Sequence, residues 1–154
     1  LDAVTDDVCR IDGVKRDTQK MHPLLRFLAC ALLKATPVGL LQALSFLFEA
    51  LCKRDLRIYA ESFGAHLYHY QDYKNQEIDA VIELSDGQWC AFEIKLGANQ
   101  IDAAEENLLE IKKQIEAAPK GNPPAVLCVL CGMANAAYQR PDEVFVVPVT
   151  TLRP

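Results

Sequence analysis

The sequence lacks an excess of positive charge. Its 154 residues include 16 Lys and Arg against 21 Asp and Glu, which gives a formal net charge of −5 at pH 7. Proteins that bind nucleic acid along its backbone need Lys and Arg to displace counterions from the phosphates. We therefore expect that this chain does not coat nucleic acid unaided, and that any nucleic-acid function depends on a local basic patch or a metal ion.

Long hydrophobic runs are missing as well. The most apolar stretch, from Val38 to Cys52, is interrupted by polar residues and is shorter than the ~20 apolar residues that a membrane-spanning helix requires. Residues 1–7 are acidic where a secretory signal would be basic. These absences predict a soluble, cytoplasmic protein that does not have a membrane as a partner.

Disulfides are also not expected, although the chain has six cysteines. The cysteines lie mostly in apolar segments, as reduced thiols that act as small core residues do. Cys128 and Cys131 have the CxxC spacing of metal ligands, but they fall in an apolar run that should be a strand. Residues three apart on a strand point to opposite faces, so the sequence predicts core cysteines there and not a zinc site.

The spacing of apolar residues predicts one α/β domain, in which 1–36 form an arm with a short helix and 37–154 form the core. Thr36-Pro37 and Gly64 are typical start and stop signals of a long helix. The further elements expected are strands at 66–70, 77–84 and 88–96, a helix at 101–117, and strands at 125–131 and 144–149. Asp86-Gly87 predicts a tight hairpin, and the helix after the third strand predicts that the fourth strand runs parallel to its neighbour.

Two of these strands bear the residues that could do chemistry. In Ala91-Phe92-Glu93-Ile94-Lys95-Leu96, strand alternation places Glu93 and Lys95 on one face. Asp79 in the preceding strand can reach the same face across the hairpin, because neighbouring strands lie roughly 4.8 Å apart. Two carboxylates and an ammonium group are therefore expected to converge.

Carboxylates this close repel each other unless a cation joins them. Mg²⁺ or Mn²⁺ suits the site, since these hard ions bind a few carboxylate and carbonyl oxygens and keep water in their remaining positions. The carbonyl of Ile94 is a further candidate ligand. Such an ion would promote attack of water on a phosphodiester, with Lys95 orienting the water or stabilising the transition state. The alternative is an ordinary cross-strand salt bridge on a surface hairpin.

Several segments together resemble a known family. They are Phe46 to Leu51, Arg54 to Glu61, Tyr68 to Tyr70, Glu77 to Glu83 and Ala91 to Gly97, with a looser likeness in Ala137 to Asp142 and Val144 to Pro148. These segments resemble the C-terminal domain of uncharacterised prokaryotic AAA-type ATPases, which itself resembles the PD-(D/E)xK nuclease superfamily. The resemblance implies a restriction-endonuclease-like core with the order helix, three-strand antiparallel meander, helix, strand, strand.

The resemblance also implies roles for individual residues. Asp79 and Glu93 would ligate the metal, and Lys95 would be the catalytic lysine. Glu49, on the first core helix, matches an acid that contacts a metal or its water in many superfamily members. The alternative for Glu49 is an ion pair with Lys53 one helical turn later.

The chain departs from this family in two respects. It contains no G-x-x-x-x-G-K-[ST] motif, so ATP hydrolysis by this chain is not expected. The stretch before Pro37 is shorter than in the relatives, so no winged helix is expected before Thr36.

The sequence leaves more than one function open. The first hypothesis is a Mg²⁺-dependent phosphodiesterase that acts on DNA, and the second is a catalytically silent nuclease-fold module that binds DNA or a partner AAA-type ATPase. A homo-oligomer formed through an uncovered side of the helix Phe46 to Phe63 is a third interpretation. The nuclease hypothesis requires basic side chains near the acids, from among Lys15, Arg16, Arg54, Arg57, Lys74 and Lys95.

An aromatic group is the last candidate. Tyr68, Tyr70, Tyr73 and Trp89 lie in or beside the predicted meander. They could stack on single-stranded bases or serve only in sheet packing, and the sequence does not separate these two interpretations.

Overall fold

The computed structural model describes residues 36–72 and 76–152. Contacts within the chain group it into two units, residues 1–44 and 45–154. The predicted arm and the short helix before Thr36 lie outside the described residues, as do Tyr73, Lys74 and the expectation about the winged helix.

Helix α3 (Pro37–Ser62) begins and ends at the signals predicted from the sequence. The Gly39 amide donates to Oγ1 of Thr36 at 3.2 Å, which makes Thr36 the N-cap. At the other end Gly64 has a φ of +76°. The Ala65 amide donates to the Ala60 carbonyl at 2.9 Å, the hydrogen bond that closes a Schellman motif.

A single mixed sheet of six strands follows, in the order β1-β2-β3-β4-β6-β5. The strands are β1 (His66–Gln71), β2 (Glu77–Glu83), β3 (Trp89–Lys95), β4 (Val126–Cys131), β5 (Tyr138–Gln139) and β6 (Phe145–Pro148). The first three form an antiparallel meander, and β3, β4 and β6 are parallel. The predicted α/β class and the parallel fourth strand are thus confirmed, whereas the two-residue β5 was not predicted, because it is too short to show a period.

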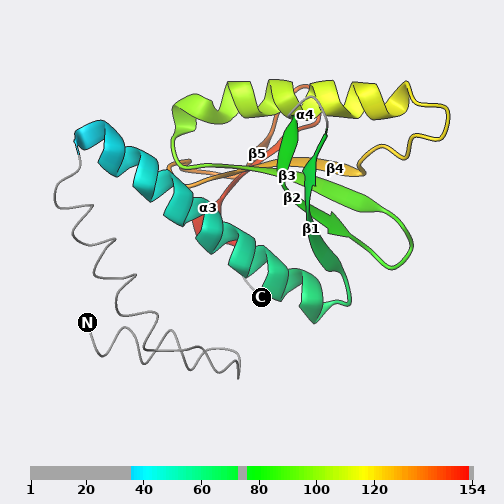
Figure 1. The fold of residues 1–154 in the computed structure, drawn as a ribbon, viewed down its shortest axis with the longest axis horizontal. Helices are drawn as coiled ribbons and strands as arrows, with labels where there is room; N and C mark the ends of the chain where they lie inside the picture. The colour runs from blue at the N-terminus through cyan, green and yellow to red at the C-terminus, as the bar shows by residue number, and fades with distance from the viewer. Residues whose placement is uncertain (1–35, 73–75, 153–154) are drawn as a thin grey trace. The chain divides into compact units, whose positions relative to one another are not determined.

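The two faces of the sheet are covered by different helices (Figure 1). On one face, Cys52, Leu56 and Ala60 of α3 pack against a core that includes Ile94 and Leu130. On the other face, α4 (Ile101–Glu116) packs against the sheet through its buried residues Ile101, Ala104, Leu108 and Ile111. Each face therefore has its own apolar core, with the sheet between them.

The two cysteines of the CxxC motif lie in different cores. Cys128 belongs to the α3 side and Cys131 to the α4 side, and both are free and buried. Burial raises the pKa of the Cys128 thiol to about 12, so it remains protonated at neutral pH. The prediction that these thiols are core residues on opposite faces of the sheet is confirmed.

Strand β2 has a bulge at its centre. Tyr68 pairs with Val81 and Tyr70 pairs with Ile78, so two residues of β2, Asp79 and Ala80, face one residue of β1. A bulge interrupts alternation and redirects the side chains around it. Consequently Ile78 lies in the core under α4 although Ala80, two residues later, lies in the core under α3.

Within the described part of the chain, no helix combines the length and hydrophobicity needed to span a bilayer.

Candidate functional site

Asp79 lies where the ladder between β2 and β3 ends. The paired residues run from Glu83 and Trp89 to Ala80 and Phe92. Beyond that point the Asp79 side chain replaces a backbone acceptor, since its Oδ2 accepts a hydrogen bond from the backbone amide of Ile94 at 2.8 Å. Asp79 is only 5% exposed. The carboxylate therefore completes the bonding of β3 and is fixed in position by it.

The carbonyl of Ile94 faces the same side as this hydrogen bond. The carbonyls of Trp89 and Lys95 accept hydrogen bonds from the segments at either end of β4, so odd-numbered residues of β3 direct their polar backbone atoms toward β4. Even-numbered residues direct theirs toward β2, and a residue's N–H and C=O point to the same edge of its strand. The Ile94 carbonyl is thus directed toward the Asp79 side of β3, as a ligand there must be.

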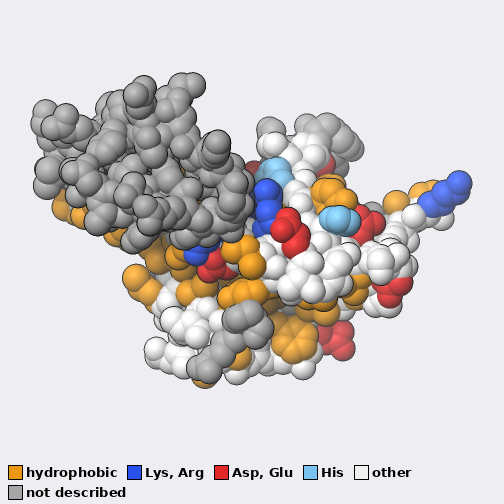
Figure 2. Space-filling model, turned by 90° about the horizontal axis from the view of Figure 1, so that it is seen from below, with side chains coloured by type: hydrophobic (Ala, Val, Ile, Leu, Met, Phe, Trp, Pro, Cys, Tyr) orange, Lys and Arg blue, Asp and Glu red, His pale blue; other side chains and the backbone are white. Residues whose placement is uncertain are grey.

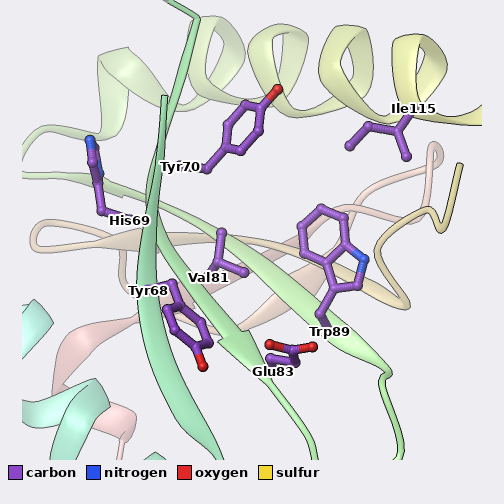
Figure 3. Close-up of a pocket in the computed structure, with 7 residues that line it drawn as sticks. All are labelled: Tyr68, His69, Tyr70, Val81, Glu83, Trp89 and Ile115. Carbon is purple, nitrogen blue, oxygen red and sulfur yellow. The ribbon is translucent and has the colours of Figure 1, made fainter. Parts of the chain in front are cut away.

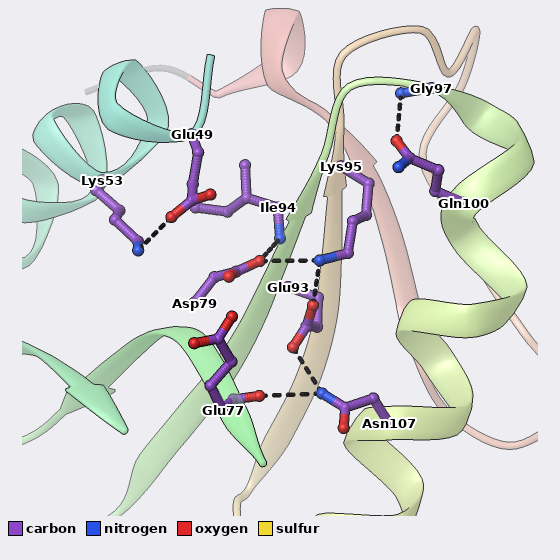
Figure 4. Close-up of polar contacts among 10 residues, drawn as sticks. All are labelled: Glu49, Lys53, Glu77, Asp79, Glu93, Ile94, Lys95, Gly97, Gln100 and Asn107. Carbon is purple, nitrogen blue, oxygen red and sulfur yellow. Dashed lines mark hydrogen bonds and ion pairs between the residues drawn. The ribbon is translucent and has the colours of Figure 1, made fainter. Parts of the chain in front are cut away.

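Lys95 joins the two acids. Its Nζ lies 2.5 Å from Oε2 of Glu93 and 3.2 Å from Oδ2 of Asp79 (Figure 4). Glu93 is 3% exposed, and the Lys95 side chain is 26% exposed. The structure thus brings together the three residues that the sequence singled out on this face of the sheet.

Asn107 of α4 is a member of this cluster that sequence reasoning missed. Its Nδ2 donates to Oε1 of Glu93 at 2.9 Å and to the backbone carbonyl of Glu77 at 3.0 Å. The available signal was its place beside the buried stripe of α4, one residue before Leu108 and three after Ala104. A neutral amide next to an apolar stripe needs a hydrogen-bond partner, and Glu93 supplies it.

The cluster has more negative than positive charge. Burial, followed by repulsion from Asp79, raises the pKa of Glu93 to about 7, although Lys95 and Asn107 act in the opposite direction. Burial alone would lower the pKa of Lys95, but its contacts with Glu93 and Asp79 outweigh this and raise it. Near neutral pH the site therefore holds an ammonium group and two carboxylates, one of which is close to taking up a proton.

The cluster opens into a cleft of about 410 Å³ beside α4. Glu93, Lys95 and Asn107 line it, together with Glu77 and Gln100. Gln100 also caps the turn before α4, since its Oε1 accepts a hydrogen bond from the Gly97 amide at 3.2 Å. Side chains that line an open cleft are accessible to a ligand.

Glu49 makes the alternative contact that the sequence left open. Its Oε1 lies 2.5 Å from Nζ of Lys53, one turn further along α3 (Figure 4). Of the contacts found among residues 36–72 and 76–152, this ion pair is the one that Glu49 makes, and none joins it to Asp79 or Glu93. A role for Glu49 at the metal stays a prediction.

The donor set is compatible with Mg²⁺. Two buried carboxylates and one carbonyl directed toward them are hard oxygen donors, and Mg²⁺ is often held by one or two carboxylates plus water. The excess negative charge also favours a divalent cation. No group of three or more His, Cys, Asp or Glu side chains in the described ranges is arranged to hold a metal, so water would have to complete the coordination.

Basic side chains do not gather at these acids. Of the six candidates, Lys15, Arg16 and Lys74 lie outside the described residues. Arg54 pairs with Asp55, and Arg57 lies on α3, which covers the opposite face of the sheet from Glu93. Figure 2 shows the side of the molecule away from α4, where Lys and Arg side chains also lie at separate places among acidic side chains. Among the described residues, these candidates therefore form no basic patch around Lys95 that could bind phosphates.

A family model described as a domain of unknown function, DUF4143, matches residues 44–152. No curated protein and no solved structure matches the chain significantly.

Proposed function

The chain belongs to the DUF4143 family, a domain that occurs alongside AAA-type ATPases, and from its own site we propose that it is a Mg²⁺-dependent phosphodiesterase that cleaves DNA. The proposal includes the predicted PD-(D/E)xK relationship. Supporting it are the order helix, antiparallel meander, helix, parallel strand, and the position of Asp79 next to Glu93-Ile94-Lys95.

One observation above all supports this proposal. Two carboxylates, each 5% exposed or less, share one ammonium group, and two of these three residues, Glu93 and Lys95, line a cleft. Burying charge is costly, and replacing such a cluster by apolar residues is often neutral or stabilising. An ionic cluster with a net negative charge is therefore poorly explained by stability, and strongly perturbed pKa values in a cleft are typical of functional sites.

Each residue has a specific task in this proposal. Asp79, Glu93 and the Ile94 carbonyl would hold the cation, which when bound supplies positive charge against the scissile phosphate. Lys95 would donate hydrogen bonds to the attacking water or to a phosphate oxygen. The water oxygen forms a new bond to phosphorus, the P–O bond to the leaving oxygen breaks, and a proton reaches that oxygen. Asn107 would keep Glu93 in the orientation that this requires.

The direct test is cleavage of plasmid and single-stranded DNA with and without Mg²⁺ or Mn²⁺. Cleavage should require the ion and be lost in Lys95→Ala. The matched control is Lys112→Ala, which removes a lysine of α4 that pairs with Glu116 at 3.9 Å and does not line the cleft. Ion-independent cleavage, or unchanged cleavage by Lys95→Ala, would refute the assignment.

A second candidate function is a silent binding module for DNA or a partner AAA-type ATPase. Two observations favour it. Lys95 already contacts both acids, as a purely structural ion cluster would. Apolar side chains are also exposed on α3, namely Phe46 at 72%, Leu47 at 50%, Leu51 at 42% and Ile58 at 44%. A folded wild-type protein that neither cleaves DNA nor binds Mg²⁺ in calorimetry would favour this module, and sedimentation would test the predicted homo-oligomer.

A further inference from the structure

A second hollow, of about 260 Å³, lies beside α4 at the other end of β3. Tyr68 and Tyr70 of β1, Trp89 of β3 and Ile115 of α4 form its aromatic and apolar walls, with Val81 and Glu83 of β2 between them (Figure 3). His69 of β1 also lines it, and we term these seven residues the aromatic hollow. Its walls come from three strands and a helix, so it is a product of the tertiary fold.

The aromatic hollow shares a sheet face with the ionic cluster. Trp89, Glu93 and Lys95 are at alternate positions of β3, so their side chains project to one side. Trp89 is opposite Glu83, and Val81 is opposite both Ala91 and Tyr68, which extends this face across β2 to β1. Trp89 and Glu93 are four residues apart, which corresponds to about 13 Å along the strand. Ala91 between them is buried under α4, so a chain that contacts both sites at once has to pass beside this helix.

The indole of Trp89 is held in a fixed orientation. Its Nε1 donates to the carbonyl of Asn122 at 2.8 Å, and the Asn122 side chain donates to the carbonyl of Gly87 at 3.0 Å. By contrast, Tyr68 and Tyr70 remain 49% and 36% exposed. One aromatic wall is thus preorganised and the other is accessible, which lowers the entropic cost of placing a flat ring between them.

The chemistry of the walls indicates the class of ligand. Aromatic faces bind nucleobases by stacking, with little dependence on sequence. The carboxylate of Glu83 is an acceptor at the edge of the hollow, and adenine, cytosine and guanine each have an exocyclic amino group that can donate to it. Stacking also needs no basic patch, in agreement with the net charge of −5 and the missing patch around Lys95.

We infer that the aromatic hollow holds an unpaired nucleobase of the strand whose phosphodiester lies at Asp79, Glu93 and Lys95. This inference rests on the proposed nuclease function and makes its substrate single-stranded. In an intact duplex the faces of the bases are stacked on one another and do not reach such a hollow.

The experiment uses the intrinsic fluorescence of Trp89, which is the only tryptophan of the chain. The Lys95→Ala protein is titrated with a short mixed-sequence single-stranded oligodeoxynucleotide, in the absence of divalent ions so that no cleavage occurs. We expect quenching by this strand and none by its blunt duplex or by an abasic strand of equal length. Equal quenching by the abasic strand or the duplex would overturn the inference.

Variants of Tyr70 test the same hollow from its other wall. Tyr70→Leu should weaken the binding that quenches Trp89 by about 5- to 150-fold, the range for losing one base stack of ~1–3 kcal/mol. Tyr70→Phe keeps the stacking ring and should bind as tightly as the parent. Tyr138→Leu is the matched control, because Tyr138 is 46% exposed on β5, outside the hollow. Equal affinities for all three variants would also overturn the inference.

The readouts separate this inference from the proposed function. Selective quenching without any cleavage by the wild-type protein would retain the base site and refute the nuclease. Metal-dependent cleavage of single strands without quenching would retain the nuclease and refute the base site.

Discussion

The two ends of the hairpin formed by β2 and β3 are built differently. At the Trp89 end, backbone pairs with backbone, and the side chains leave a hollow for a flat ring. At the Asp79 end, a carboxylate replaces the backbone acceptor for Ile94, and charges lie inside the protein. This difference shows that the fold fixes a side chain firmly where its regular ladder stops, because the side chain then becomes part of the strand's own hydrogen bonding.

The largest effect should come from removing the lysine of the Asp79 end. Lys95→Ala leaves Asp79 and Glu93 facing each other without their ammonium partner, which should abolish cleavage and lower the free energy of unfolding by about 3 kcal/mol. Urea denaturation at pH 7 measures this loss. Lys112→Ala, which breaks a long ion pair whose side chains are 31% and 48% exposed, should cost at most about 1 kcal/mol. Equal losses of unfolding free energy in the two variants would mean that the ion pairs of Lys95 stabilise the protein no more than that of Lys112.

The pH dependence of stability should come next in size. The pKa of Glu93 is raised to about 7 from an ordinary 4.5, so the folded state binds the proton more tightly than the unfolded state. Proton binding at Glu93 therefore contributes up to about 3 kcal/mol to the free energy of unfolding. This contribution is complete below about pH 4.5 and is lost as pH rises to about 7. Urea denaturation between pH 4.5 and 8 should show this fall, and Glu93→Gln should flatten it.

Mg²⁺ provides the control for that profile. Because the cation needs an ionised Glu93, added Mg²⁺ should stabilise the wild-type protein at pH 8 and have little effect at pH 5. Stabilisation of equal size in Glu93→Gln would show that the ion binds elsewhere. Glu106→Gln, at an exposed carboxylate of α4, should retain the wild-type profile.

A smaller effect should separate the two roles of Asp79, which supplies a negative charge and accepts the hydrogen bond of the Ile94 amide. Asp79→Asn and Asp79→Ala both remove the charge, but only Asn keeps an acceptor for the Ile94 amide. Asp79→Ala should therefore be the less stable by about 1–3 kcal/mol, the cost of a buried donor without a partner. At the other end of the hairpin, Glu83→Gln and Glu83→Ala should agree within about 0.5 kcal/mol. An equal difference in stability between the two variants at both ends would show that the Asp79 end does not depend on its side chain more than the Glu83 end does.

The smallest predicted effect concerns Asn107. Asn107→Ala removes hydrogen bonds to Glu93 and to the Glu77 carbonyl, which should cost about 1 kcal/mol in stability. It should also weaken Mg²⁺ binding about tenfold, as loss of an outer hydrogen bond to a ligand does. Calorimetric titration measures the affinity, with Gln114→Ala as the control, since Gln114 donates to the exposed Glu110 on the same helix. An unchanged affinity would leave Asn107 a purely structural role.

The sequence was sufficient for the parts of the fold that follow a simple period. Alternation along β3 placed Glu93 and Lys95 on one face, and Asp86-Gly87 marked the hairpin that brings Asp79 near them. The bulge at Asp79 and Ala80 was not predictable, because it depends on register with β1 and has no glycine to mark it. Asn107 was missed because a helical asparagine is usually solvated, and only the packing of α4 shows its partner. Glu49 kept two interpretations, because an i,i+4 partner was available on its own helix.

The confinement of Asp79, Glu93 and Lys95 to one hairpin has a consequence for folding kinetics. Contacts between residues 79 and 95 are local and can form early, while the carboxylates are still hydrated. Burial on this face is completed only when α4 docks and Asn107 reaches Glu93, so the repulsion between the acids arises late. A group whose energetic cost arises after the transition state changes the unfolding rate and not the folding rate. We therefore expect that near neutral pH the charged site shortens the lifetime of the native state and leaves the time needed to reach it unchanged.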